Sequence, residues 1–147
     1  MYLRSLLIAL ATFLPVCLFA QSGLRPDLKD TANVPKFAEV MPRFQDGNAG
    51  WSEFLQANLD SKVITKLSEN NKEVRKKGLN ERVIAKFVVC EDGGICNISI
   101  VNRESVHPEL ADEVVRVLKL SPVWEPGSQD GKKVKVYYTQ PVLFRLK

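Results

Sequence analysis

The residues best suited to chemistry are few and lie far apart in this chain. The one histidine, His107, stands directly before Pro108, and the carboxylates are scattered without a predicted close pair. A catalytic triad or a metal centre needs several converging ligands, which this spacing does not offer. We expect His107 to serve at a helix start, and we expect no enzyme activity, no metal and no cofactor.

Cys90 and Cys96 flank a turn and are the other candidates for chemistry. In an exported chain two cysteines favour a disulfide. A two-residue turn would put the sulfurs on opposite faces, whereas a type I turn with a bulge at Gly93 pairs Val89 with Ile95 and puts them on one face. We favour the bridge, which would stabilise the fold by at most roughly a few kcal/mol because its loop is short. A redox-active pair is the alternative.

The N-terminus predicts export. An apolar run interrupted at Pro15 follows Arg4, and Ala20 offers a small residue for cleavage. A short apolar stretch behind a positive charge is typical of a secretory signal peptide, and a membrane span needs roughly 20 apolar residues. We expect residues 1–20 to be a signal peptide cleaved after Ala20, with an uncleaved anchor as the alternative.

The rest of the chain is long enough for one domain and a tail. Residues 21–38 are polar, contain prolines and lack periodicity, so we expect a flexible leader, followed by the domain over residues 39–147. The formal net charge of +4 is too small to indicate nucleic-acid binding.

The first part of the domain predicts a helix. Its apolar residues recur at i, i+3, i+4 and i+8, as on one helix face: Trp51, Phe54, Leu55 and Leu59. Asp46 or Asn48 could cap this helix. Both tryptophans are expected in the core, since large aromatics dominate core burial. We further expect a short strand over residues 63–67 and an exposed basic connection over residues 68–80.

A second helix is predicted from Pro108, which suits the first helical position. Its apolar stripe has helical spacing and is expected to be buried: Leu110, Val114, Val117 and Leu118. Asp112 and Arg116 could pair on the exposed side. Pro122 is expected to end this helix, because proline disfavours helical geometry in the residue before it.

The strands have the most regular pattern. Side chains alternate over residues 82–90, Asp92-Gly93 supplies a turn, and residues 95–101 return. A last strand is predicted over residues 133–146, and Pro141, which cannot donate to a ladder, indicates an edge or a bulge. A helical crossover returns the chain parallel to the strand it left. We predict an α+β fold with a small antiparallel three-stranded sheet, ordered second, first, last, packed by two helices on one face.

Six groups of motif residues are spread over residues 39–147. They are, in chain order, Met41-Pro42-x-Phe44 with Trp51 and Phe54-Leu55, Phe87-Val88-Val89-x-x-Asp92-Gly93, Leu110-Ala111-x-x-Val114-Val115-Arg116-Val117, Ser121-Pro122-x-Trp124-x-Pro126-Gly127, Gly131-Lys132-x-Val134 and Pro141-Val142-x-Phe144. In this order they resemble the TonB C-terminal domain family, in the variant of Bacteroidetes TonB-like proteins. The resemblance implies a periplasmic protein-binding module, associated with TonB-dependent transport across the outer membrane.

The resemblance also implies a binding mode. Domains of this family bind a short receptor segment that adds to the sheet beside the last strand, so that backbone hydrogen bonds supply the affinity. The matching positions in this chain lie on the edge strand from Val134 to Leu146, particularly at Lys135, Tyr137 and Thr139. The residues expected to contact the partner are Val134, Lys135, Val136, Tyr137, Tyr138 and Thr139. Lys133, Lys135 and Pro141 could instead protect an edge that binds nothing.

The family's long proline-rich spacer is missing from the sequence. If the signal peptide is cleaved, we expect a protein that binds an outer-membrane receptor or another envelope protein but transmits no force. The alternative function is a periplasmic adaptor or scaffold with the same fold and no role in transport. Paired edge strands could also form a homodimer. No nucleic acid and no small-molecule substrate are expected.

Overall fold

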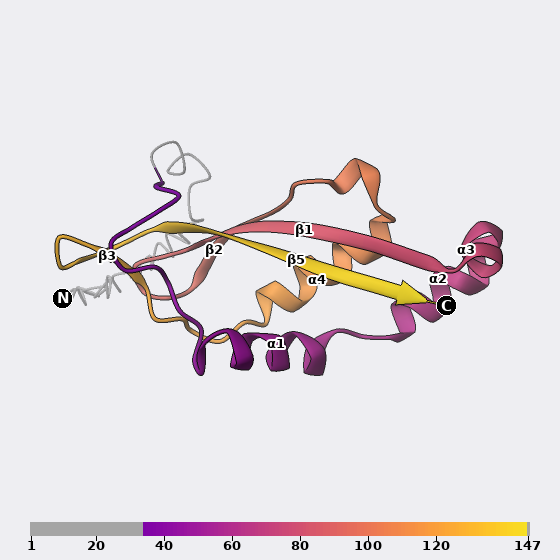
Figure 1. Ribbon diagram of the computed structural model, residues 1–147, viewed down its shortest axis with the longest axis horizontal. Helices are drawn as coiled ribbons and strands as arrows, with labels where there is room; N and C mark the ends of the chain where they lie inside the picture. The colour runs from indigo at the N-terminus through magenta and orange to yellow at the C-terminus, as the bar shows by residue number, and fades with distance from the viewer. Residues whose placement is uncertain (1–33, 147) are drawn as a thin grey trace, which may run out of the picture.

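The computed structural model describes residues 34–146, so the predicted signal peptide and most of the leader lie outside the described residues. A three-stranded antiparallel sheet has the order β2-β1-β5, and a two-stranded ribbon pairs β3 with β4 (Figure 1). The strands are β1 Leu79–Val89, β2 Ile95–Ile100, β3 Gly127–Gln129, β4 Lys132–Val134 and β5 Val136–Leu146. The helices are α1 Gly47–Asn58, α2 Lys62–Asn70, α3 Lys72–Lys77, η2 Arg103–Ser105 and α4 Pro108–Lys119. The predicted α+β class and strand order are confirmed.

One aromatic cluster joins α1 to the sheet. The Trp51 ring stacks on Phe54 with centroids 5.4 Å apart and meets Trp124 edge-on at 5.0 Å. Phe87 of β1 and Tyr138 of β5 stack at 5.4 Å on the same face of the sheet. Both tryptophans are almost completely buried, as predicted.

The predicted apolar stripe of α4 is confirmed. Its four side chains are at most 1% exposed: Leu110, Val114, Val117 and Leu118. They belong to the same core cluster as the α1 aromatics and the odd-numbered residues of β1. Both helices therefore cover one face of the sheet, because alternate residues of a strand point to the same side.

The prediction for residues 63–80 was wrong. Residues 63–67 lie in α2 rather than in a strand, and the expected open connection holds the end of α2, all of α3 and the start of β1. Each short helix buries one apolar residue, Leu67 in α2 and Val74 in α3. The Asn71 side chain accepts hydrogen bonds from the N–H groups of Glu73 and Val74, so that it caps α3.

Two smaller expectations were also wrong. Neither candidate caps α1, since Asp46 adopts φ 60° without a side-chain cap bond and Asn48 lies inside the helix. Asp112 does not pair with Arg116 but with Arg103 of η2. Arg116 instead reaches Glu113, whose carboxylate faces the loop between α1 and α2.

The predicted single last strand is divided. Residues 132–134 form β4, which folds back onto β3 through a turn at Asp130 and Gly131, both with positive φ. The main-sheet strand β5 begins only at Val136. The small ribbon thus separates Val134 from the edge of the main sheet.

Glu113 is a buried carboxylate, 6% exposed, at the junction of α4 with the α1–α2 loop. It accepts two hydrogen bonds of 2.7 Å from Arg116 and one of 2.7 Å from the N–H of Asp60. The hydrogen bond from Arg116, followed by that from Asp60, lowers the pKa of Glu113 against the opposing effect of burial. Arg116 is 47% exposed, so solvent screens the pair.

Glu113→Gln is expected to lower the free energy of unfolding near neutral pH by about 1 to 2 kcal/mol. Because the pKa of Glu113 is lower in the folded state, its stabilisation is complete above the ordinary value of 4.5 and is lost as pH falls through the folded value. Urea denaturation across this acidic range tests both points. The exposed control Glu53→Gln should change little, and equal losses in both variants would contradict the assignment.

Candidate functional site

One of the two edges of the sheet is formed by β5, which pairs with β1 along its length, and the other is formed by β2 (Figure 1). On β1, the N–H of Ile84 donates to the Asn102 side chain and its carbonyl accepts from Val101, both on the β2 side. In an antiparallel ladder both backbone groups of a residue face the same neighbour. The register pairs Ile84 with Pro141, so the backbone of Pro141 faces outward from the sheet.

The residues of β5 whose backbone groups point away from β1 are therefore the odd-numbered ones. From Thr139 to the end of the strand, all members of this set have exposed side chains: Thr139, Pro141, Leu143 and Arg145. Within residues 34–146, no backbone carbonyl accepts from the outward N–H of Thr139, Leu143 or Arg145. Pro141 removes no ladder bond, because its nitrogen points away from β1, so proline does mark the edge as predicted.

The start of β5 contacts the chain's own segment 34–43, called here the leader strand. Tyr137 N–H donates to the Pro35 carbonyl at 3.2 Å. Further along, Val40 and Ser128 exchange backbone hydrogen bonds of 3.0 and 2.9 Å. The leader strand is thus irregular backbone that bridges to Ser128 of β3 at Val40 and reaches the edge of β5 at one point.

An ion pair between side chains holds the C-terminal end of the leader strand. Arg43 and Glu125 exchange backbone hydrogen bonds, and the Arg43 guanidinium also donates twice to the Glu125 carboxylate, at 3.0 and 3.2 Å. The hydrogen bond from Arg43 lowers the pKa of Glu125. Part of the predicted flexible leader, residues 34–38, is therefore continuous with a segment that pairs with the domain.

The six predicted contact residues fall into separate groups. Val134 ends β4, and Lys135 lies between β4 and β5. Val136 and Tyr138 point to the core face, where Val136 is fully buried. Tyr137 and Thr139 point to the opposite face, and Lys86 Nζ lies 4.0 Å from the centroid of the Tyr137 ring.

Leu143 and Arg145 lie in the predicted edge strand but were not among the six residues predicted to contact a partner. They share with Thr139 an outward backbone and an exposed side chain. The spacing at two-residue intervals from Pro141 could have identified them, because alternate residues of an antiparallel strand present their backbone groups to the same side.

His107 belongs to a separate structural cluster. It precedes α4 as predicted, but its side chain makes no cap hydrogen bond. Its ring contacts Glu81 of β1 through Nδ1 and the Asn71 amide nitrogen through Nε2. Because the oxygen of Asn71 is used in capping α3, Nε2 must accept and Nδ1 carries the proton. The cluster joins β1, α3 and α4.

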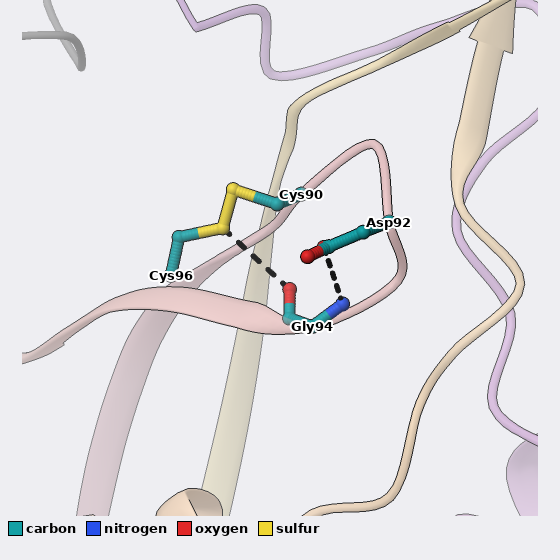
Figure 2. The surroundings of a disulfide bond; sticks show 4 residues. All are labelled: Cys90, Asp92, Gly94 and Cys96. Carbon is teal, nitrogen blue, oxygen red and sulfur yellow. Dashed lines mark hydrogen bonds between the residues drawn. A yellow bond between two sulfur atoms is a disulfide. The ribbon is translucent and has the colours of Figure 1, made fainter. Parts of the chain in front are cut away.

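The Cys90–Cys96 disulfide closes the hairpin between β1 and β2, with Cα atoms 6.0 Å apart (Figure 2). Val89 pairs with Ile95 whereas Val88 pairs with Asn97, so Cys96 is the extra residue of a bulge. The turn is closed by hydrogen bonds between Cys90 and Gly94 and between Gly93 and Cys90, each 2.8 Å long. The pairing of Val89 with Ile95 confirms that part of the bulged alternative. That alternative also paired Val88 with Cys96, which was wrong, because Cys96 is itself the extra residue and Val88 pairs with Asn97.

Removal of this disulfide is expected to lower the free energy of unfolding by about 2 kcal/mol, because the closed loop is short. Denaturation of the wild-type protein should therefore shift in the presence of a reductant, whereas a Cys90→Ser, Cys96→Ser double variant should not respond. Alkylation of both cysteines in the native protein without reductant would contradict the bridge.

Fold and edge together define the class: a small α+β module that presents one side of its last strand. The family model described as Gram-negative bacterial TonB protein C-terminal matches residues 72–146, from α3 to the end of β5. The chain belongs to the TonB C-terminal domain family. It has no significant match among curated proteins.

Neither a metal site nor a membrane-spanning helix is found within residues 34–146. No three His, Cys, Asp or Glu side chains gather there in a way that could hold a metal ion. In the same residues, every helix is too short or too polar to cross a membrane.

Proposed function

We propose that this protein is a periplasmic TonB-like binding module that takes up a short extended segment of an outer-membrane receptor along the edge of β5. The observation that carries the proposal is the row of outward N–H groups at Thr139, Leu143 and Arg145. Strand addition would use these donors and the carbonyls of the same residues, which face outward with them. Family membership supports a TonB-like role in transport or protein interaction.

The proposed contact is centred on residues 139–145. The leader strand already bonds to Tyr137, and Val136 and Tyr138 direct their side chains to the core face. A partner segment could contact the side chains of Tyr137 and Thr139 at one end and pair with the backbone from Thr139 onward. Residues 134–136 would then support the start of the edge rather than contact the partner.

Two variants at one position test the proposed mode. Thr139→Pro removes an outward N–H without removing a bond to β1, whereas Thr139→Ala keeps that N–H and removes only the side chain. Both should retain the fold, because the Thr139 side chain is exposed. Capture of detergent-solubilised outer-membrane proteins on immobilised protein should fall at least about tenfold for Thr139→Pro, since the ring also blocks close approach.

Thr139→Ala should capture the same proteins as the wild type. Circular dichroism and the denaturation midpoint establish that both variants are folded before their binding is compared. Equal capture by folded Thr139→Pro and Thr139→Ala would contradict strand addition at this edge.

A further inference from the structure

The face of the sheet opposite the helices, called here the back face, has charges of one sign only. The strand register assigns to it the following residues: Asn80, Arg82, Ile84, Lys86 and Val88 of β1, Asn97 and Ser99 of β2, and Tyr137, Thr139, Pro141, Leu143 and Arg145 of β5. The charged members are Arg82, Lys86 and Arg145, and none of these described strand residues is acidic. The back face therefore favours an anionic partner.

A hollow of about 540 Å³ lies over this face beside the β5 edge. Ile84, Lys86 and Thr139 of the sheet line it, and Phe37 and Met41 of the leader strand line it as well. Phe37 is 81% exposed and Met41 is 40% exposed. Several exposed apolar side chains gathered around one hollow indicate a binding surface more strongly than single exposed residues do.

The charges around the hollow have the same sign as those of the back face. Its lining includes two lysines, Lys36 and Lys86, and no acidic residue. Lys86 already lies over the Tyr137 ring, which limits the freedom of its ammonium group. The hollow thus combines apolar walls with two positive charges at its border.

A strand added to β5 would place every second side chain on the back face. A side chain beside Thr139 would lie at the border of the hollow, because Thr139 belongs both to the outward edge and to the lining. A residue two positions along the partner would lie on the same side. The strand edge and the hollow are therefore continuous parts of one surface.

We propose that this hollow is the selectivity pocket of the partner site, and that it takes a large apolar side chain with a carboxylate two residues away. The inference rests on the proposed strand addition. The apolar side chain would pack against Phe37 and Met41, and the carboxylate would meet Lys36 or Lys86. A second copy of this chain fits poorly, because paired β5 strands would bring basic back faces together.

Three short synthetic peptides of alternating Thr and Val provide the probes. The first carries Phe and Asp two residues apart, the second has Ala in place of Phe, and the third has Lys in place of Asp. Titration into isotope-labelled protein, followed by amide chemical shifts, should show the first peptide binding about tenfold more tightly than either of the others. Added salt should reduce the advantage of Asp over Lys.

Substitutions in the lining of the hollow should change these peptide preferences. Phe37→Ala is expected to abolish the preference for Phe over Ala, and Lys86→Glu is expected to reverse the preference for Asp over Lys. Leu120→Ala is the matched control, because Leu120 is 53% exposed and lies outside the lining of the hollow. This control should keep both preferences.

The outcomes separate the inference from the proposed function. If all three peptides shift the amides of Thr139 and Leu143 with equal affinity, strand addition stands and the selectivity pocket is wrong. If none of them shifts those amides, strand addition itself is contradicted and the pocket with it. Equal peptide preferences in Phe37→Ala and in the wild type would also overturn the assignment of the hollow.

Discussion

Trp51→Ala is expected to lower the free energy of unfolding by about 4 kcal/mol. Trp51 is 3% exposed and its ring contacts four other aromatic rings: Phe44, Phe54, Phe87 and Trp124. Its Nε1–H also donates to the Gln140 side chain of β5 at 2.7 Å. The variant loses both the packing of α1 on the sheet and a direct connection to the edge strand. Urea denaturation followed by circular dichroism measures the loss.

Two controls identify the cause of the lost stability. One separates the packing of the Trp51 ring from its hydrogen bond, and the other measures the effect of removing an exposed aromatic side chain. Trp51→Phe keeps an aromatic ring but removes the donor to Gln140, so it should cost less than Trp51→Ala. Phe37→Ala removes an aromatic side chain that is 81% exposed and should change stability by less than about 0.5 kcal/mol. A loss for Trp51→Ala as small as that for Phe37→Ala would contradict the described core.

Gly93→Ala is expected to lower the free energy of unfolding by about 3 kcal/mol. Gly93 has φ 85°, and a Cβ there would overlap the Trp124 carbonyl oxygen and lie 2.7 Å from Val123 Cγ1. The Gly93 carbonyl also accepts from the Trp124 N–H at 2.9 Å. The hairpin tip is thus packed against the segment that carries Trp124, and a methyl group would separate them.

Gly131→Ala is the matched control for Gly93→Ala. Its φ is also positive, at 71°, but no heavy atom lies within 4 Å of an added Cβ. It should therefore show only the backbone strain of the left-handed conformation, about 1 kcal/mol. Equal losses at both glycines in thermal or urea denaturation would show that the contact with Trp124 has no energetic role.

The elements predicted correctly are those whose local sequence pattern is sufficient to define their secondary structure. The hairpin of β1 and β2 has strict alternation around Asp92-Gly93, and α4 has a complete apolar stripe after Pro108. The order of the strands followed from the crossover through α4. Local pattern and a topological rule were sufficient for these parts of the fold.

The helices that the sequence analysis missed are mostly polar, and each buries a single apolar residue. Leu67 and Val74 are the buried residues of α2 and α3, and charged or amide residues surround them. Asn71, two residues before Glu73, was the available signal for a new helix start. The division of the last strand was signalled by Asp130-Gly131, a dipeptide that favours tight hairpins.

The candidate site was only partly predictable for a different reason. Pro141 identified an edge, but which residues face outward depends on the register of β5 against β1. The docking of Pro35 on Tyr137 depends on a backbone contact between distant parts of the chain, which no local pattern encodes. The proposed site therefore extends toward Arg145 rather than toward Val134.

Amide hydrogen exchange along β5, with and without a captured receptor segment, tests the central claim most directly. Strand addition predicts slower exchange at Thr139, Leu143 and Arg145, whose N–H groups face outward, and little change at Gln140 and Val142, which already face β1. Pro141 has no N–H and should leave a gap in this alternating pattern. A bound segment that leaves the three outward amides exchanging as in the free protein would contradict strand addition to β5.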